Sequence, residues 1–152
     1  EEMFKVTKAG IKFYSELFGQ KYPFGKYDQV FVPEAIYGAM ENVGCVTYAE
    51  FNIYSGDYKS MAKRLRTQIR NLHELCHMWF GNMVTMKWWN DLWLNEAFAS
   101  YMSFLSMSSI PELAYFDTVW ITFLEYKQYG IGADELTSTH PVCCEINETI
   151  EA

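Results

Sequence analysis

The chain has 152 residues, with 12 lysines and arginines against 19 aspartates and glutamates, which gives a formal net charge of −7. Hydrophobic residues make up 50% of the sequence and aromatic residues 18%, enough to bury the core of one domain and too many for an intrinsically disordered chain. The acidic balance argues against a nucleic-acid-binding surface. The sequence predicts no signal peptide and no membrane span.

The predicted elements begin with an amphipathic helix over residues 3–18, which Gly19 ends. Two short apolar runs bounded by loop residues predict strands, and Pro111 is typical of the first turn of a late helix. The other expected ranges are strands at 29–32 and 45–48, helices at about 60–80, 92–107 and 111–128, and irregular structure over 130–152. This order predicts one domain of the α+β class.

The cysteines favour a reducing compartment. The four of them, Cys45, Cys76, Cys143 and Cys144, include no CxxC pair, and neighbouring cysteines such as the last two rarely bridge each other. We therefore expect a cytoplasmic protein. A secreted or membrane-anchored parent stays open, because residues 147–149 form a glycosylation sequon that matters only in a secreted protein.

The most informative segment is His73-Glu-Leu-Cys-His77, inside the long helix expected over 60–80. A helix turns about 100° per residue, so His73 and His77 project from one face, one turn apart. Two neutral imidazoles at this spacing can bind one Zn²⁺, and Glu74 lies beside them where its carboxylate can reach a metal-bound water. Cys76 falls in the apolar stripe of the helix, so we interpret it as a core residue.

A catalytic zinc usually has three protein ligands and one open position. The best third ligand is Glu96, nineteen positions after His77 and on the next predicted helix. Its neighbours on that helix face, Ala99, Ser100 and Ser103, are small, which would let the two helices approach closely. On these residues alone, the alternative that the histidines are ordinary surface side chains stays open.

Five basic residues precede the histidines in sequence. They are Lys59, Lys63, Arg64, Arg66 and Arg70. We interpret them as the solvated face of the helix. A patch that binds peptide carboxylates or nucleic acid stays open as the weaker alternative.

Three motifs in a fixed order carry a family resemblance: Gly38-Ala-Met-Glu-Asn42, His73-Glu-Leu-Cys-His77 and Trp93-Leu-Asn-Glu96. Together they resemble the gluzincin aminopeptidases, the aminopeptidase N family. Further segments resemble the same family, so the likeness covers about residues 10–141. It implies a thermolysin-like catalytic domain of the α+β class and an enzyme that removes single residues from peptide N-termini.

The resemblance also implies roles for individual residues. His73, His77 and Glu96 are expected to hold one Zn²⁺ per chain. Glu74 is expected to be the general base, and Glu41 to bind the α-amino group of a peptide with a free N-terminus. The remaining residues of the first motif are expected to contact the bound substrate: Gly38, Ala39, Met40 and Asn42. Such an anchor close to the metal would make a zinc peptidase an exopeptidase.

Two departures limit what the resemblance implies: the family most often has alanine where Cys76 stands, and the segment around a family tyrosine is missing. The family uses a tyrosine downstream of the zinc glutamate, within a Tyr-x-Lys-Gly segment that this sequence lacks, so Tyr115, Tyr126 and Tyr129 are given no such role. Family members also carry an amino-terminal β domain and a carboxy-terminal helical domain, and residues 1–152 are expected to be the central part of the catalytic domain alone. An incomplete fragment, a non-catalytic peptide-binding or partner-binding module, and a family enzyme that also opens an epoxide remain alternatives.

Overall fold

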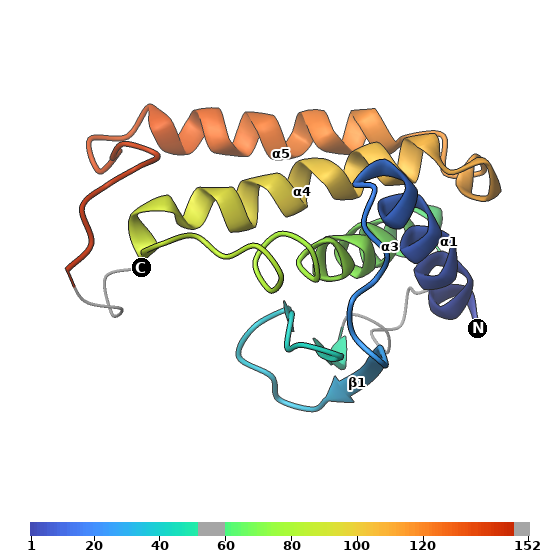
Figure 1. Cartoon of the computed structure of the whole chain (residues 1–152). Coiled ribbons are helices and arrows are strands. Elements are labelled where there is room, and N and C mark those ends of the chain that lie inside the picture. Colours follow the sequence, from blue (N-terminus) through green and yellow to red (C-terminus); the bar gives the residue numbers. More distant parts are fainter. Residues whose placement is uncertain (52–59, 148–152) are drawn as a thin grey trace.

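The computed structural model describes residues 1–51 and 60–147. It confirms the α+β class, with a small sheet at one side of a stack of helices (Figure 1). The elements are α1 (Glu2–Leu17), β1 (Asp28–Val32), β2 (Ala39–Met40), β3 (Cys45–Ala49), α3 (Met61–Cys76), α4 (Leu92–Ser109) and α5 (Val119–Asp134), with short 3-10 turns at Trp89–Asp91 and Pro111–Leu113.

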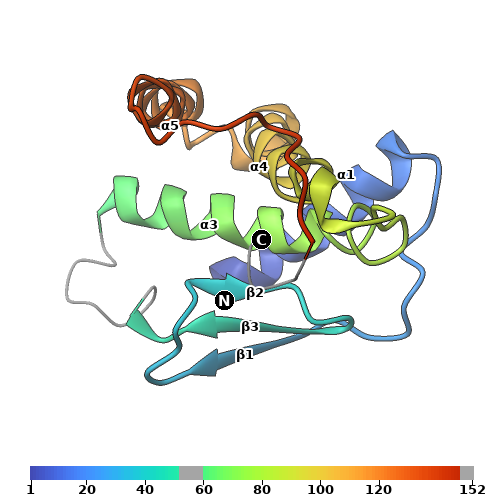
Figure 2. The same ribbon diagram turned by 90° about the vertical axis from the view of Figure 1, so that its left-hand side faces the viewer.

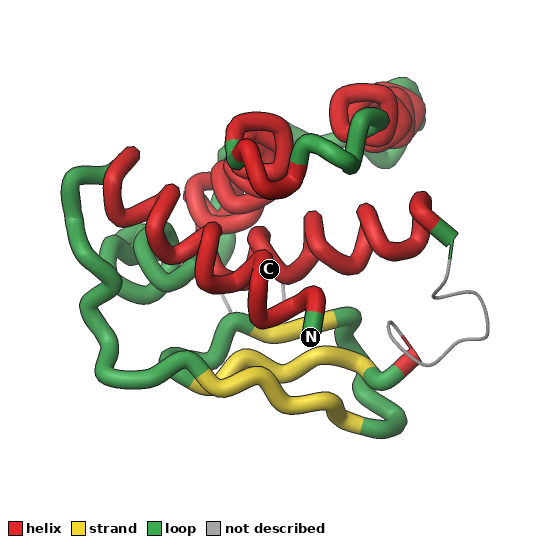
Figure 3. Tube along the Cα trace, turned by 90° about the vertical axis from the view of Figure 1, so that its right-hand side faces the viewer, coloured by secondary structure: helices red, strands yellow, loops and turns green. Residues whose placement is uncertain are grey.

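The three strands lie in the order β1-β3-β2, with β1 parallel and β2 antiparallel to β3. The sheet covers one side of α3, and β2 is the strand nearest to that helix (Figure 2). On the other side of α3 lie α4 and then α5, and α1 packs alongside α3 (Figure 3). The middle helix α3 is therefore enclosed, which is what allows it to carry buried polar side chains.

The apolar stripe predicted for α3 forms the centre of the core. Leu65, Ile69, Leu72 and Cys76 are at most 4% exposed, which confirms the interpretation of Cys76 as a core residue. Ser60 caps the helix, its hydroxyl accepting a hydrogen bond from the backbone N–H of Lys63. Each buried leucine or isoleucine of this stripe contributes roughly 1.5–3 kcal/mol relative to an exposed position.

Small residues bring α4 close to α3, as the sequence predicts. Ala99, Ser103 and Ser106 are fully buried between the helices. The hydroxyl of Tyr14 connects α1 to both helices, because it lies within hydrogen-bond distance of the Leu72 carbonyl on α3 (3.1 Å) and the Ser106 hydroxyl on α4 (3.0 Å). The side of α4 that carries Leu94, Phe98 and Tyr101 faces outward, since these side chains are 36–47% exposed.

Two predicted helix boundaries are wrong. The long helix ends at Cys76, not near residue 80, because the chain then turns back on itself and the Asn82 N–H donates to the His77 carbonyl at 2.9 Å. The helix expected from Pro111 is only a 3-10 turn. Burial of Leu113 and Phe116 redirects the chain there, and α5 begins at Val119 and continues to Asp134.

Within the described part of the chain, no helix combines the length and the hydropathy needed to cross a bilayer.

Candidate metal centre

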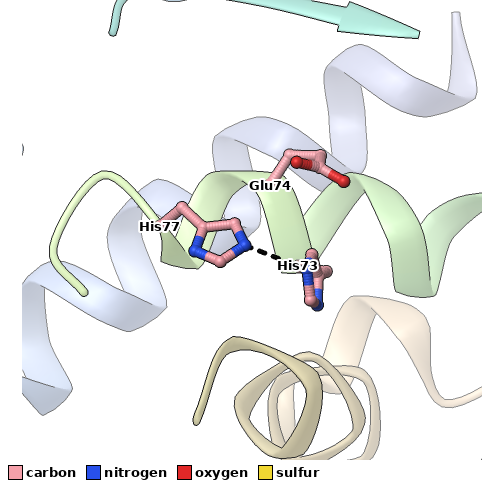
Figure 4. Close-up of side chains that lie close together, drawn as sticks. All are labelled: His73, Glu74 and His77. Carbon is pink, nitrogen blue, oxygen red and sulfur yellow. Dashed lines mark hydrogen bonds between the residues drawn. The ribbon is translucent and has the colours of Figure 1, made fainter. Parts of the chain in front are cut away.

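His73 and His77 extend from the same side of α3, and Glu74 lies on a neighbouring side of the helix (Figure 4). The Nε2 atoms of the two histidines are 2.9 Å apart, and their rings are nearly perpendicular. His77 is 1% exposed and His73 is half-buried. The helical register predicted from the sequence therefore places both imidazoles at one point.

Glu96 reaches this point from α4. Its Oε2 atom lies 3.4 Å from Nε2 of His73 and 3.8 Å from Nε2 of His77. Ligands of one tetrahedral zinc, with bonds of about 2.0–2.1 Å, lie roughly 3.4 Å from one another. The three predicted ligands are thus brought together at separations that suit a single small cation.

The two Nε2 atoms are hydrogen-bonded to each other, and that of His73 also lies close to Glu96 Oε2, so a bound metal would replace these contacts, while the Nδ1 atoms have partners of their own. The Nδ1–H of His77 donates to the Phe80 carbonyl at 3.1 Å and to Oδ1 of Asn95 at 2.7 Å, so its Nε2 carries the lone pair. Nδ1 of His73 lies 3.3 Å from the Ser100 hydroxyl. Burial lowers the pKa of His77, which keeps its imidazole neutral, as a metal ligand must be.

The chemistry of this donor set fits zinc: two imidazole nitrogens and one carboxylate. Burial is also the main reason why the pKa of Glu74 rises to about 7, with the carboxylates of Glu41 and Glu96 adding to the effect. A cation held by the histidines would counter that rise. Glu96 stays charged, because its hydrogen bond with His73 lowers its pKa.

The segment Gly38–Asn42 runs beside α3, and its Ala39–Met40 part forms β2. One carboxylate oxygen of Glu41 lies within 4.8 Å of ligand atoms of His77 and Glu96. The Glu41 carbonyl accepts a hydrogen bond from Nδ2 of Asn82 at 2.9 Å, which holds this end of the segment against the turn after α3. The Asn42 side chain instead donates to Thr47 Oγ1 at 3.4 Å, within the sheet.

Asn95 is a central residue of the site that the sequence reasoning did not assign. Besides its contact with His77, its Nδ2 lies 3.3 Å from Oε1 of Glu41 and 3.4 Å from Oε1 of Glu96. Gly81 makes room for it: a Cβ there would meet Oδ1 of Asn95 at 2.2 Å, and its φ of +127° favours glycine. The only sequence signal was its position directly before Glu96.

We expect Asn95→Ala to lower zinc affinity by roughly 10–100-fold, because His77 would lose the acceptor that orients its ring and fixes its tautomer. Competition with a calibrated chelator measures this affinity. Asn90→Ala is the matched control, because Oδ1 of Asn90 accepts from the Ile146 N–H, outside the metal centre. Equal zinc affinities of the Asn95→Ala variant and the unmodified protein would contradict the assignment.

Two histidines one turn apart on a buried helix, a buried glutamate next to them and a carboxylate from the following helix are the arrangement of a metallopeptidase centre. Comparison with known families agrees with this class. The model of the peptidase family M1 domain matches residues 2–152. The chain belongs to peptidase family M1.

Individual relatives carry aminopeptidase names. The chain is 42% identical to an aminopeptidase N of Streptomyces lividans over 149 residues, which cover 97% of this chain and 17% of that protein. It is 41% identical over 144 residues to a puromycin-sensitive aminopeptidase of Caenorhabditis elegans, covering 93% of this chain and 15% of the relative. The chain thus spans only about one sixth of the length of these curated relatives.

Proposed function

We propose that this chain forms the catalytic core of a zinc-dependent aminopeptidase that removes single residues from the free N-terminus of peptides. His73, His77 and Glu96 would hold one Zn²⁺. The metal, when bound, would supply the Lewis acidity that activates water and polarises the scissile carbonyl. Membership in family M1 and the aminopeptidase names of the relatives support the reaction class.

Two glutamates of the chain would supply proton transfer and substrate binding. Glu74, 5% exposed, would take a proton from the attacking water and pass it to the leaving amine. Its carboxylate would hold that proton between the two steps. Glu41 would bind the substrate ammonium through a charge-assisted hydrogen bond.

The observation that carries the proposal is the position of Glu41. Its carboxylate lies within 4.8 Å of ligand atoms of His77 and Glu96, so an ammonium bound to it would sit next to the metal centre. Only about one residue then fits between the amine and the bond at the metal. An endopeptidase would need this space open for further substrate residues.

Replacement of Glu41 tests the anchor. We expect Glu41→Ala to lower kcat/KM for an aminoacyl anilide with a free amine by roughly 10–100-fold, the cost of a lost hydrogen bond to a charged group. The preference for the free over the N-acetylated anilide should shrink by the same factor. Zinc content should not change, because the metal would keep its three ligands.

The matched control is Glu50→Ala, which removes an exposed carboxylate just after β3. It should leave kcat/KM unchanged. A Glu41→Ala variant that keeps the full preference for the free amine would refute the role of Glu41.

A further inference from the structure

The basic residues of α3 have different environments. Arg64 pairs with Glu2, and Arg66 pairs with Glu125 at 3.2 Å between two largely exposed side chains. Arg70 is half-buried and lines a cavity of about 180 Å³. The prediction that the basic residues form a solvated helix face therefore holds for Arg66 and not for Arg70.

This cavity opens directly beside the metal centre, between α3, α4 and α5. Its lining includes Arg70, His73, Glu74, Ser100, Ser103 and Tyr126. At about 30 Å³ per water molecule, the volume has room for several waters and hence for a short polar side chain. Arg70 and the hydroxyl residues contribute polar groups to its lining, and Glu74 contributes a carboxylate.

The segment Gly38–Asn42 relates this cavity to the amine anchor. A Cβ at Gly38 would lie 3.4 Å from both Cζ and Nε of Arg70, so the guanidinium lies beside the start of the segment. The other end, at Glu41, is bound to Asn82 and Asn95 near His77. Arg70 and His77 are about 10 Å apart along α3. A substrate with its amine at Glu41 and its carbonyl at the ligands would thus direct its leaving portion toward Arg70.

We propose that Arg70 selects substrates that carry a carboxylate on the leaving side of the scissile bond, an inference that rests on the proposed aminopeptidase function. The guanidinium presents five N–H donors in a planar fork that matches a carboxylate, so it can add this partner to those it already has. The carboxylate can come from an acidic second residue or from the free C-terminus of a dipeptide.

Two pairs of substrates for the full-length enzyme separate these sources. Leu-Glu-amide against Leu-Gln-amide varies only the side-chain charge, and Leu-Gly against Leu-Gly-amide varies only the terminal charge. We expect kcat/KM to favour the carboxylate by about tenfold or more in at least one pair. The pair that shows the preference identifies the source. Equal kcat/KM values in both pairs would overturn the proposal, whatever the variants do.

The preference should disappear in Arg70→Gln and be partly kept in Arg70→Lys, which retains the charge without the fork. Arg66→Gln removes a charge from the same helix outside the cavity and should keep the full preference. A preference that survives Arg70→Gln unchanged would contradict the role of Arg70. Thermal melting checks that each variant is folded, and Arg70→Lys serves as the second test if the glutamine variant is not.

A binding measurement gives a readout that does not depend on turnover. In the Glu74→Gln background, calorimetry on the pair that shows the kinetic preference should give a Kd for the charged member about tenfold below that for the uncharged member, and Arg70→Gln should remove the difference. Hydrolysis of the uncharged Leu-Gln-amide separates the two proposals. If it is cleaved but neither pair shows a preference for the charged member, the inference about Arg70 fails and the aminopeptidase function stands.

Discussion

A Glu74→Gln variant is expected to bind zinc normally and to lose about 100–10,000-fold in kcat, the usual contribution of a positioned general base. The side chain is not one of the three groups whose atoms converge at 2.9–3.8 Å, so its replacement leaves the proposed ligands in place. It is buried next to them, where its carboxylate can reach a water bound to the metal. Glutamine has nearly the same shape and cannot accept the proton.

Two measurements on one sample check this prediction: zinc content by elemental analysis and kcat with a free aminoacyl anilide. Glu125→Gln is the control, since it neutralises an exposed carboxylate that pairs with Arg66 on the surface. If Glu74→Gln keeps full turnover, another group must act as the base. If it loses zinc as well as turnover, Glu74 is part of the binding site and its role is wrongly assigned.

Glu96→Ala should have the largest effect on metal binding. Among the described residues, it removes the one carboxylate within 4 Å of both Nε2 atoms, at 3.4 and 3.8 Å. Loss of a direct ligand should exceed the roughly 10–100-fold that loss of an outer hydrogen-bond partner costs. The side chain is 50% exposed and contributes little to the core, so the variant should fold. Turnover should fall with zinc occupancy and recover partly at high zinc concentration.

Chelator competition measures the zinc affinity of Glu96→Ala. Thermal unfolding of the metal-free protein measures its stability, so that a loss of zinc binding can be told apart from a loss of folding. Glu112→Ala removes another exposed glutamate, in the turn before α5, and should change neither quantity. Unchanged zinc affinity in Glu96→Ala would contradict its role as the third ligand.

Part of this fold could be predicted because α1 and α3 have a simple helical periodicity of apolar residues. The apolar stripe of α3 predicted that helix, and the small residues of α4 predicted its close contact with α3. The position of His73 and His77 on one face follows from helical geometry alone. The boundaries that failed depend on tertiary contacts. Because Phe116 is buried, the chain turns after Pro111 and α5 begins only later. The local sequence does not reveal that Phe116 is buried.

The site residues that belong to a sequence motif could be predicted. Those that act through contacts between distant segments could not. The position of Glu96 on the next helix predicted it as a ligand, and the family resemblance pointed to Glu41; the structure places both carboxylates near His77. The bridging role of Asn95 depends on Gly81, fourteen positions earlier in sequence, which makes room for its side chain. Arg70 was assigned to a solvated face, because helical periodicity does not reveal that α4 and α5 enclose a cavity beside it.

The most direct test of the central claim is hydrolysis of an aminoacyl anilide by the full-length protein, measured with added zinc, with a chelator, and beside the N-acetylated anilide. We predict zinc-dependent release of the chromophore from the free amine, loss of this release with the chelator, and little release from the acetylated substrate. Release that is equally fast from both substrates, or that survives removal of the metal, would contradict a zinc aminopeptidase. No release from the zinc-loaded protein would favour a non-catalytic peptide-binding module.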